Sequence, residues 1–278
     1  DETLTLSGTL TQSGAITIDV ADGKTLTYSG AALSLDNNTL TLSGEGRLSN
    51  SNALVLNNAS SKLLLSNSIT VDSVRTSLAS LGLDVDANST VTSLTVGHTT
   101  PVSIASGITL SGGITVTAGS IKLDEAGTLG STVSMSGGTL DVDKTLTLSG
   151  ALTQSGSITI DVKAGEVLTY SGAAVSLGAN TLTLSGGGTL SNTNALALDN
   201  ADSLLTLAGI LTIGDVEGTA ASNSGKGILV TSSATLGDYD LSAESYLAIA
   251  EDQTLGGQLN LQSNGELNIS GLGRYTGD

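Results

Sequence analysis

The stretch Thr3-Leu4-Thr5-Leu6-Ser7-Gly8 indicates the fold of this chain, because close copies of it recur. The copies occupy residues 25–30, 39–44, 145–150, 167–172 and 181–186, and each alternates polar with apolar residues before a Ser-Gly pair. Alternate side chains of a β-strand face opposite ways, so the leucines would share one face and the threonines the other. Thr favours strands and Gly favours turns. The motif therefore predicts short strands that become stable only when many copies stack.

The chain also carries a long internal duplication. Residues 1–71 align without gaps to residues 143–213, and roughly 48 of the 71 aligned pairs are identical, which is far beyond chance at a fixed period. We therefore expect one continuous solenoid over residues 1–278, with a first unit at 1–142 and a second at 143–278. No convincing helix is visible. Residues 74–81 and 241–248 are the two places where a single helical turn is possible.

Composition favours a solenoid over a β-sandwich or barrel. The chain has no Phe, no Trp, one Met and 36 Gly, whereas sandwiches and barrels usually place aromatic residues in their cores. In a solenoid each strand pairs in parallel with its equivalents above and below, so that thin aliphatic layers can fill the core. At about 20 residues per coil we expect on the order of 14 coils, stacked into a rod ~65 Å long at the spacing of β-strands.

Charge and residue content exclude several kinds of partner. The net charge is −17 with only nine Lys and Arg, so we expect no nucleic-acid partner and no binding to anionic membranes. No apolar run reaches the roughly 18 residues that span a bilayer. The absence of Cys excludes disulfides and Cys-ligated zinc, and it fits an exported bacterial protein. Because the chain starts at Asp1, we expect a processed chain or a segment of a longer one.

Degenerate Thr-Leu-Thr-Leu-Ser-Gly and Gly-x-Leu-x-Leu-x-Asn coils, poor in Lys, Cys and aromatics, resemble the β-helical passenger or stalk regions of large bacterial surface proteins. These include autotransporter and filamentous-haemagglutinin-type adhesins. The resemblance covers essentially the whole chain, in style rather than in a specific motif. It implies an all-β, single-stranded, right-handed parallel β-helix at the cell exterior that serves as a stalk, adhesive fibre or coat. It implies no catalytic residues, and we expect residues 1–278 to hold neither the cap nor the membrane anchor of complete members of that family.

The candidates for catalysis and metal binding are few. His98 lies in a turn-like setting with no acidic neighbour, which favours a solvated side chain over a catalytic base. A Ca²⁺ site is better supported than a catalytic site, because neighbouring acids could supply oxygen ligands. However, Ala164 and Gly178 replace Asp22 and Asp36 in the second unit, so these acids are not needed to form the coil. We therefore expect no obligate cofactor, with opportunistic Ca²⁺ sites left open. The acid pairs are Asp19/Asp22, Asp84/Asp86, Asp124/Glu125, Asp141/Asp143, Asp199/Asp202, Asp238/Asp240 and Glu251/Asp252.

Tyrosines and threonines have structural explanations. Tyr28 and Tyr170 stand where other copies of the motif have Leu, so we expect them to fill the core rather than to stack on sugars. Tyr239, Tyr246 and Tyr275 lie near the C-terminal end, where we expect contact with a cap or a neighbouring subunit. Repeated Thr-x-Thr pairs resemble the arrays of ice-binding solenoids, but their spacing is irregular and the strand propensity of Thr explains them.

The two ends of the solenoid are the predicted site of assembly. Solenoids expose unpaired strand edges at their ends, and polar capping repeats normally block them. Here the first and last regions still read as coil strands, which predicts either a fragment of a longer solenoid or subunits that stack end to end. The residues assigned to this interface are Thr3, Leu4, Thr5, Leu6, Leu267, Ile269 and Tyr275.

The functional hypothesis is a non-enzymatic, extracellular, structural or adhesive solenoid that acts as a stalk, coat or filament subunit. Its expected partners are further copies of itself, the rest of a larger surface protein, or a cell-surface glycan. The alternative is a carbohydrate-binding or polysaccharide-cleaving β-helix, which would need clustered acids and exposed aromatic residues on one face.

Overall fold

The structure is a computed structural model that describes residues 3–209 and 211–277. The described residues contain no helix, and parallel strands stack into a β-solenoid of about 13 turns. The predicted solenoid is therefore confirmed, and the sandwich and barrel are excluded. The possible helical turns at 74–81 and 241–248 are wrong. Strand β9 (Thr70–Thr76) covers the start of the first segment and bends follow it, and β31 (Glu244–Ile249) covers most of the second.

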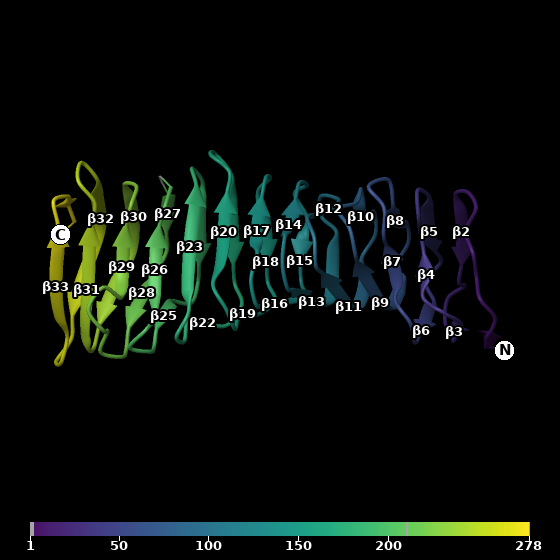
Figure 1. Ribbon diagram of the computed structural model, residues 1–278, viewed down its shortest axis with the longest axis horizontal. Helices are drawn as coiled ribbons and strands as arrows, with labels where there is room; N and C mark the ends of the chain where they lie inside the picture. Colours follow the sequence, from purple (N-terminus) through teal and green to yellow (C-terminus); the bar gives the residue numbers. More distant parts are fainter. Residues whose placement is uncertain (1–2, 210, 278) are drawn as a thin grey trace. The chain divides into compact units, whose positions relative to one another are not determined.

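The chain divides into two compact units, Asp1–Ser134 and Met135–Asp278. Within each unit the strands pair in parallel, and successive coils lie side by side along the sequence (Figure 1). Paired residues lie 19 to 24 positions apart, as in Leu83↔Val102 and Ile16↔Leu40. Coil length therefore varies by several residues, which explains why the sequence shows no strict period.

The strands of the first unit are short and are joined by turns rich in Gly, Asn and Asp. They are β1 (Leu4–Leu6), β2 (Ile16–Asp19), β3 (Thr25–Tyr28), β4 (Leu33–Ser34), β5 (Thr39–Ser43), β6 (Arg47–Asn50), β7 (Leu54–Leu56), β8 (Lys62–Leu65), β9, β10 (Gly82–Val85), β11 (Ser89–Val96), β12 (Thr100–Ile104), β13 (Thr109–Val116), β14 (Ser120–Leu123) and β15 (Thr128–Leu129).

Strand β16 (Thr132–Met135) spans the boundary between the units. The strands of the second unit are β17 (Thr139–Val142), β18 (Leu146–Leu148), β19 (Leu152–Gln154), β20 (Ile158–Val162), β21 (Val167–Tyr170), β22 (Val175–Ser176), β23 (Thr181–Gly186), β24 (Thr189–Asn192), β25 (Leu196–Leu198), β26 (Leu204–Leu207), β27 (Leu211–Ile213), β28 (Val216–Gly218), β29 (Gly227–Val230), β30 (Ala234–Leu241), β31, β32 (Thr254–Leu261), β33 (Glu266–Gly271) and β34 (Arg274–Tyr275).

The core of each coil consists of aliphatic ladders. In the first unit Leu40 pairs with Leu63, Leu63 with Leu83, and Leu83 with Val102, and all four side chains are buried. Most strands turn their apolar side chains inward and their Thr, Ser or Asp side chains outward, as the alternation in the sequence predicts. Thr100 on β12 and Ser245 on β31 are exceptions, because both are fully buried. Tyr28 and Tyr170 are buried as well, which confirms that they fill the core.

The recurrent motif occupies two different faces of the coil. Its copies on β1 and β3 pair with each other, Leu4 with Leu26, so they are one coil apart in one sheet. The next copy lies on β5 in the other sheet, where it pairs with β2. The same division recurs in the second unit, where β18 and β21 pair in one sheet and β23 lies in the other. The irregular spacing of the motif therefore combines steps between coils with steps between faces.

Candidate functional site

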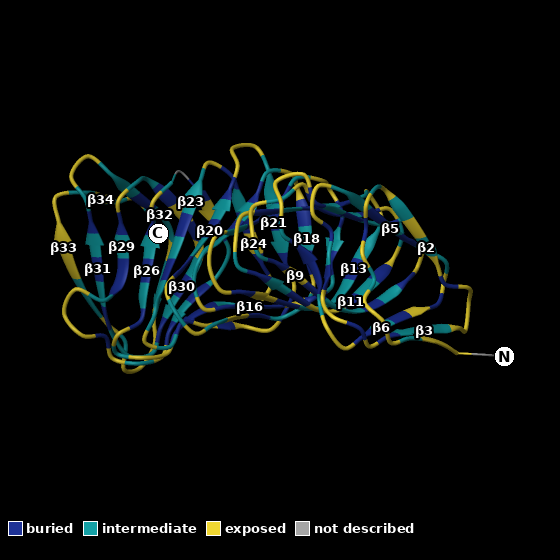
Figure 2. Ribbon diagram, turned by 45° about the vertical axis from the view of Figure 1, so that its right-hand side comes forward, coloured by how far each residue is buried: buried dark blue, intermediate teal, exposed yellow. Residues whose placement is uncertain are grey.

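The end strands are the candidate assembly site. Strand β2 pairs with β5, and the described residues place no strand on its other edge. At the C-terminal end β33 pairs with β31, and among the described strands it likewise has one free edge. Figure 2 shows β33 as largely exposed. A free edge presents unpaired backbone N–H and C=O groups, with which another strand can pair.

The predicted interface residues lie at these two ends. Thr3, Leu4 and Thr5 are exposed and Leu6 is half-buried, with Leu4 60% exposed. At the other end Leu267 is half-buried and Ile269 is 61% exposed. The structure thus leaves these side chains accessible, each group within its own unit. Whether they form an interface stays a prediction.

Tyr275 differs from the other predicted interface residues. Its hydroxyl donates a hydrogen bond to the Gly257 carbonyl oxygen at 2.7 Å, and the side chain is half-buried. Tyr239 is a core residue of its own unit, 2% exposed, with its hydroxyl oxygen 2.7 Å from Ser245 Oγ. The expected contact of Tyr239 with a cap or a neighbouring subunit is therefore wrong, because strand β30 turns this ring inward.

The buried hydroxyl of Tyr239 predicts a loss of stability at high pH. Burial raises its pKa to about 12, against a smaller opposing effect of the hydrogen bond with Ser245. The resulting stabilisation is present below about pH 10, where the phenol is protonated in both states, and is lost as the pH rises through about 12. Unfolding midpoints of the wild type should fall across this window. Tyr239→Phe should flatten the fall, and the half-buried Tyr246→Phe should not; equal curves for all three would contradict the assignment.

At least twelve of the 26 acidic side chains contact a side chain of a neighbouring coil. Ser43 Oγ donates to Asp19 Oδ1 at 2.6 Å, Asn57 Nδ2 to Asp36 Oδ1 at 2.7 Å, and Arg47 to Asp72 Oδ1 at 2.6 Å. In each contact the two residues lie one coil apart. The same kind of contact is made by Lys62 with Asp84, Ser103 with Asp124, Thr145 with Glu166, Lys163 with Asp143, Ser176 with Asp199, Ser185 with Asp161, Asn223 with Asp202, Asn260 with Asp240 and Asn268 with Glu244.

These contacts also explain one difference between the duplicated units. Arg47 and Asp72 form an ion pair, and Ser49 Oγ donates to the second oxygen of Asp72 at 2.9 Å. The equivalent positions in the second unit hold Thr189 and Gly214, so both partners of the pair are replaced together. The sequence alone does not connect the two replacements, because Arg47 and Asp72 are 25 positions apart and belong to different coils.

Glu166 shows the electrostatic effect of such a contact. Hydrogen bonds from the hydroxyl and the backbone N–H of Thr145 hold the pKa of this carboxyl below its usual value, with a smaller contribution from Lys144. The side chain is a surface group, and its hydrogen-bond donors come from the preceding coil. Its role is therefore to join two coils.

The candidates for catalysis and metal binding lie apart. His98 is exposed in a bend, as predicted, and its carbonyl oxygen accepts a hydrogen bond from Thr100 Oγ1 at 2.9 Å. Within residues 3–209 and 211–277, no group of three His, Asp or Glu side chains could hold a metal ion.

The described residues also contain no helix long and apolar enough to cross a membrane.

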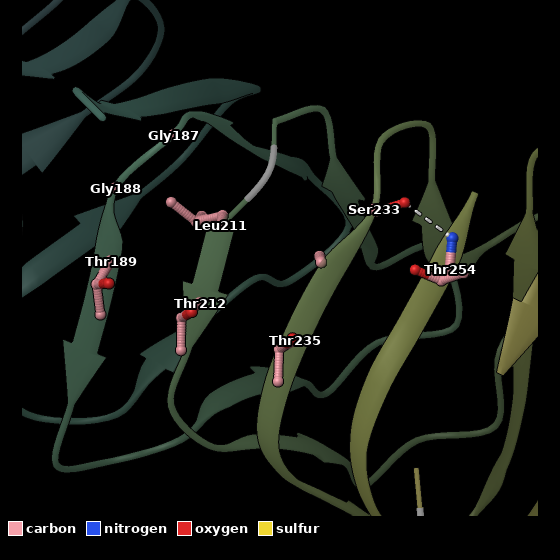
Figure 3. A pocket seen from close by; sticks show the side chains of 9 residues that line it. Gly187, Gly188, Thr189, Leu211, Thr212, Ser233, Thr235 and Thr254 are labelled. Carbon is pink, nitrogen blue, oxygen red and sulfur yellow. Dashed lines mark hydrogen bonds between the residues drawn. The ribbon is translucent and has the colours of Figure 1, made fainter. Parts of the chain in front are cut away.

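The second unit has a shallow hollow on its surface that the sequence did not indicate. Thr189, Thr212 and Thr235 are paired neighbours on β24, β27 and β30, and they line up along its floor (Figure 3). Ser233 Oγ accepts a hydrogen bond from the backbone N–H of Thr254 at 3.0 Å. Among the described residues, the lining has hydroxyls and glycines but no aromatic ring, carboxylate or cation. It offers neither a stacking surface nor an acid–base pair.

Comparisons with protein-family models, with curated proteins and with solved structures found no match to this chain. A functional assignment therefore depends on the fold and on the properties of its surface.

Proposed function

We propose that this chain is a non-enzymatic structural solenoid of the cell exterior, used as a stalk, coat or filament subunit. The observation that carries the proposal is the contrast between the closed core of its inner coils and the open edges of its end coils. Four of the six exposed large apolar side chains in the described chain lie in the end coils; they are Leu4, Leu261, Ile269 and Leu272. Unpaired strand edges of this kind allow further coils to be added to the stack.

The lateral surface supports the same function. Acids on successive coils contact hydroxyl, amide or basic side chains of their neighbours, so the negative charge stiffens the stack through cross-coil hydrogen bonds. The remaining net charge of −17 opposes sideways clumping of rods through like-charge repulsion. The extracellular placement rests on the resemblance to bacterial surface proteins and on the absence of Cys.

The alternative of a polysaccharide-cleaving or carbohydrate-binding β-helix has less support. Such a site needs a positioned acid–base pair or an aromatic platform. The Thr-lined hollow has neither among its described residues, and His98 is an exposed group in a bend.

Electron microscopy and a polysaccharide assay test the proposed function together. We expect rods of constant width with and without a calcium chelator, because the acids described above already have protein partners. We also expect no release of reducing sugar from bacterial or plant polysaccharides. Loss of the rods on chelation, or turnover of a polysaccharide, would contradict the proposal.

The response to a chelator can also be measured as stability. Because Asp19, Asp36 and Asp72 accept hydrogen bonds from neighbouring coils, removal of divalent cations should leave the thermal unfolding midpoint unchanged. Added CaCl₂ should likewise produce no rise beyond that of an equal ionic strength of NaCl. A midpoint that saturates with Ca²⁺ concentration would instead establish a specific site.

A further inference from the structure

The duplication shows what covers the strand that is open at the N-terminal end. Strand β20 is the counterpart of β2 in the second unit, and both carry the sequence Ile-Thr-Ile-Asp. β20 is covered by β17, which places Leu140 opposite Ile160 and Val142 opposite Val162. As a result Ile160 is 2% exposed, whereas its counterpart Ile18 is only half-buried. The strand that fits the open edge of β2 is therefore one that resembles β17.

Strand β33 at the C-terminal end has that pattern. β17 is preceded by Gly138 and reads Thr-Leu-Asp-Val, and β33 is preceded by Gly265 and begins Glu-Leu-Asn-Ile. Leu is retained, Ile replaces Val, and Asn replaces Asp. β33 pairs with β31 through one edge, and no described strand covers its other edge. The chain thus carries an open edge at one end and a strand suited to cover it at the other.

We propose that β33 of one copy pairs in parallel with β2 of the next copy, in the register that β17 has on β20. Leu267 then lies opposite Ile18, Asn268 opposite Asp19, and Ile269 opposite Val20. This inference rests on the proposed structural function and names the partner as a second copy of this chain. The interface is heterologous, because different surfaces of the two copies meet.

The side chains at this junction are complementary. On the core side Leu267 and Ile269 extend the aliphatic ladder over Ile18, which together with Leu6, Leu10, Leu26 and Tyr28 lines an apolar cavity of the first coils. On the outer side Asn268, whose amide already donates one hydrogen bond to Glu244 Oε1 at 2.8 Å, faces Asp19 with its second N–H. An amide that donates to the carboxylate of an adjacent coil already occurs at Asn57–Asp36, Asn223–Asp202 and Asn260–Asp240. The core layer of the junction therefore repeats the aliphatic ladder of the coils. The outer layer pairs the same two groups in the reverse order, with the amide in the earlier coil and the carboxylate in the later one.

The absence of Cys in the natural chain allows a direct test of the register. Thr17 and Glu266 are exposed, lie opposite each other in the proposed pairing, and would bring their Cα atoms to about 5 Å, within reach of a disulfide. Oxidation of the full chain carrying Thr17→Cys and Glu266→Cys should give a ladder of covalent dimers, trimers and longer species that collapses on reduction. Each single variant should give dimers at most.

A second pair of substitutions controls for random collision. Ser270 is exposed on the same strand but lies about 13 Å from the position opposite Thr17, so Thr17→Cys with Ser270→Cys should crosslink at least tenfold more slowly. Leu267→Asp, in the background of Thr17→Cys and Glu266→Cys, should remove the ladder while circular dichroism stays that of a folded solenoid.

The outcomes separate this inference from the proposed function. Equal crosslinking of the two pairs, or a folded chain that stays monomeric in sedimentation at all concentrations, overturns the junction and leaves a structural role intact. Turnover of a polysaccharide by a chain that still forms the register-specific ladder overturns the structural function and leaves the junction intact.

Discussion

Replacement of Gly186 by alanine should lower the free energy of unfolding by about 3 kcal/mol or more. Gly186 ends β23 with φ at +91°, a conformation that costs an L-residue about 1 to 2 kcal/mol. An added Cβ would also lie 2.0 Å from the carbonyl oxygen of Val162 in the preceding coil. Because that oxygen belongs to a paired backbone, relief of the overlap requires the two coils to separate. Urea unfolding followed by circular dichroism measures the loss.

Gly165 provides the matched control. Its φ is +80°, but an added Cβ would meet no atom within 4 Å. Gly165→Ala should therefore show only the cost of the backbone conformation, about 1 to 2 kcal/mol. Gly44→Ala should match Gly186→Ala, since its Cβ would lie 2.0 Å from the Val20 carbonyl oxygen. Equal losses of unfolding free energy for Gly186→Ala and Gly165→Ala would show that the close approach of the coils adds nothing to the cost of the substitution.

Replacement of Asn50 by leucine should cost about 2 to 4 kcal/mol although the volume changes little. The side chain is 3% exposed at the end of β6. Its amide donates to the carbonyl oxygens of Asn52 at 2.9 Å and Ser73 at 2.7 Å, and its oxygen accepts from the backbone N–H of Asp72 at 3.2 Å. Leucine would leave these part-buried backbone groups without this partner. Urea unfolding again measures the loss.

Asn57 is the control for this substitution, because it also bridges two coils but at the surface. It exchanges hydrogen bonds with the side chain and backbone of Asp36. Water can replace these contacts, so Asn57→Ala should cost about 1 kcal/mol or less. Asn192→Leu should match Asn50→Leu, since Asn192 donates to Asn194 and Asp215 in the same way. A loss at Asn50 no larger than that at Asn57 would refute the role of the buried amide.

Much of the fold could be predicted from local pattern. Alternation in Thr-Leu-Thr-Leu-Ser-Gly indicates a strand whichever coil it belongs to, because the period of two follows from strand geometry alone. The same alternation placed Tyr28 and Tyr170 in the core, and the lack of Phe and Trp argued for thin aliphatic layers. The duplication predicted equivalent strands, and the structure has them, for example β2 and β20 or β5 and β23.

The candidate site could be predicted only in outline. Open edges follow from the strand pattern at the two ends, and Leu4 and Ile269 are indeed exposed. The strand pattern does not tell which residues would face each other. The place of Tyr239 near the C-terminal end wrongly suggested a contact with a cap or a neighbouring subunit. The residues that face each other could be identified only from the pairing of β17 with β20, which shows how one coil covers the next.

The sequence by itself determined that this protein is a stack of short parallel strands with an aliphatic core. Only the tertiary structure decided on which face each copy of the motif lies, why Gly186 must be glycine, and why the polar side chain of Asn50 is buried. The tertiary structure also decided which basic, hydroxyl or amide side chain contacts each of the acids described above. The physical reason is that all these contacts are made between coils. Strand residues that pair between adjacent coils lie 19 to 24 positions apart, and this separation changes from coil to coil with the length of the turns.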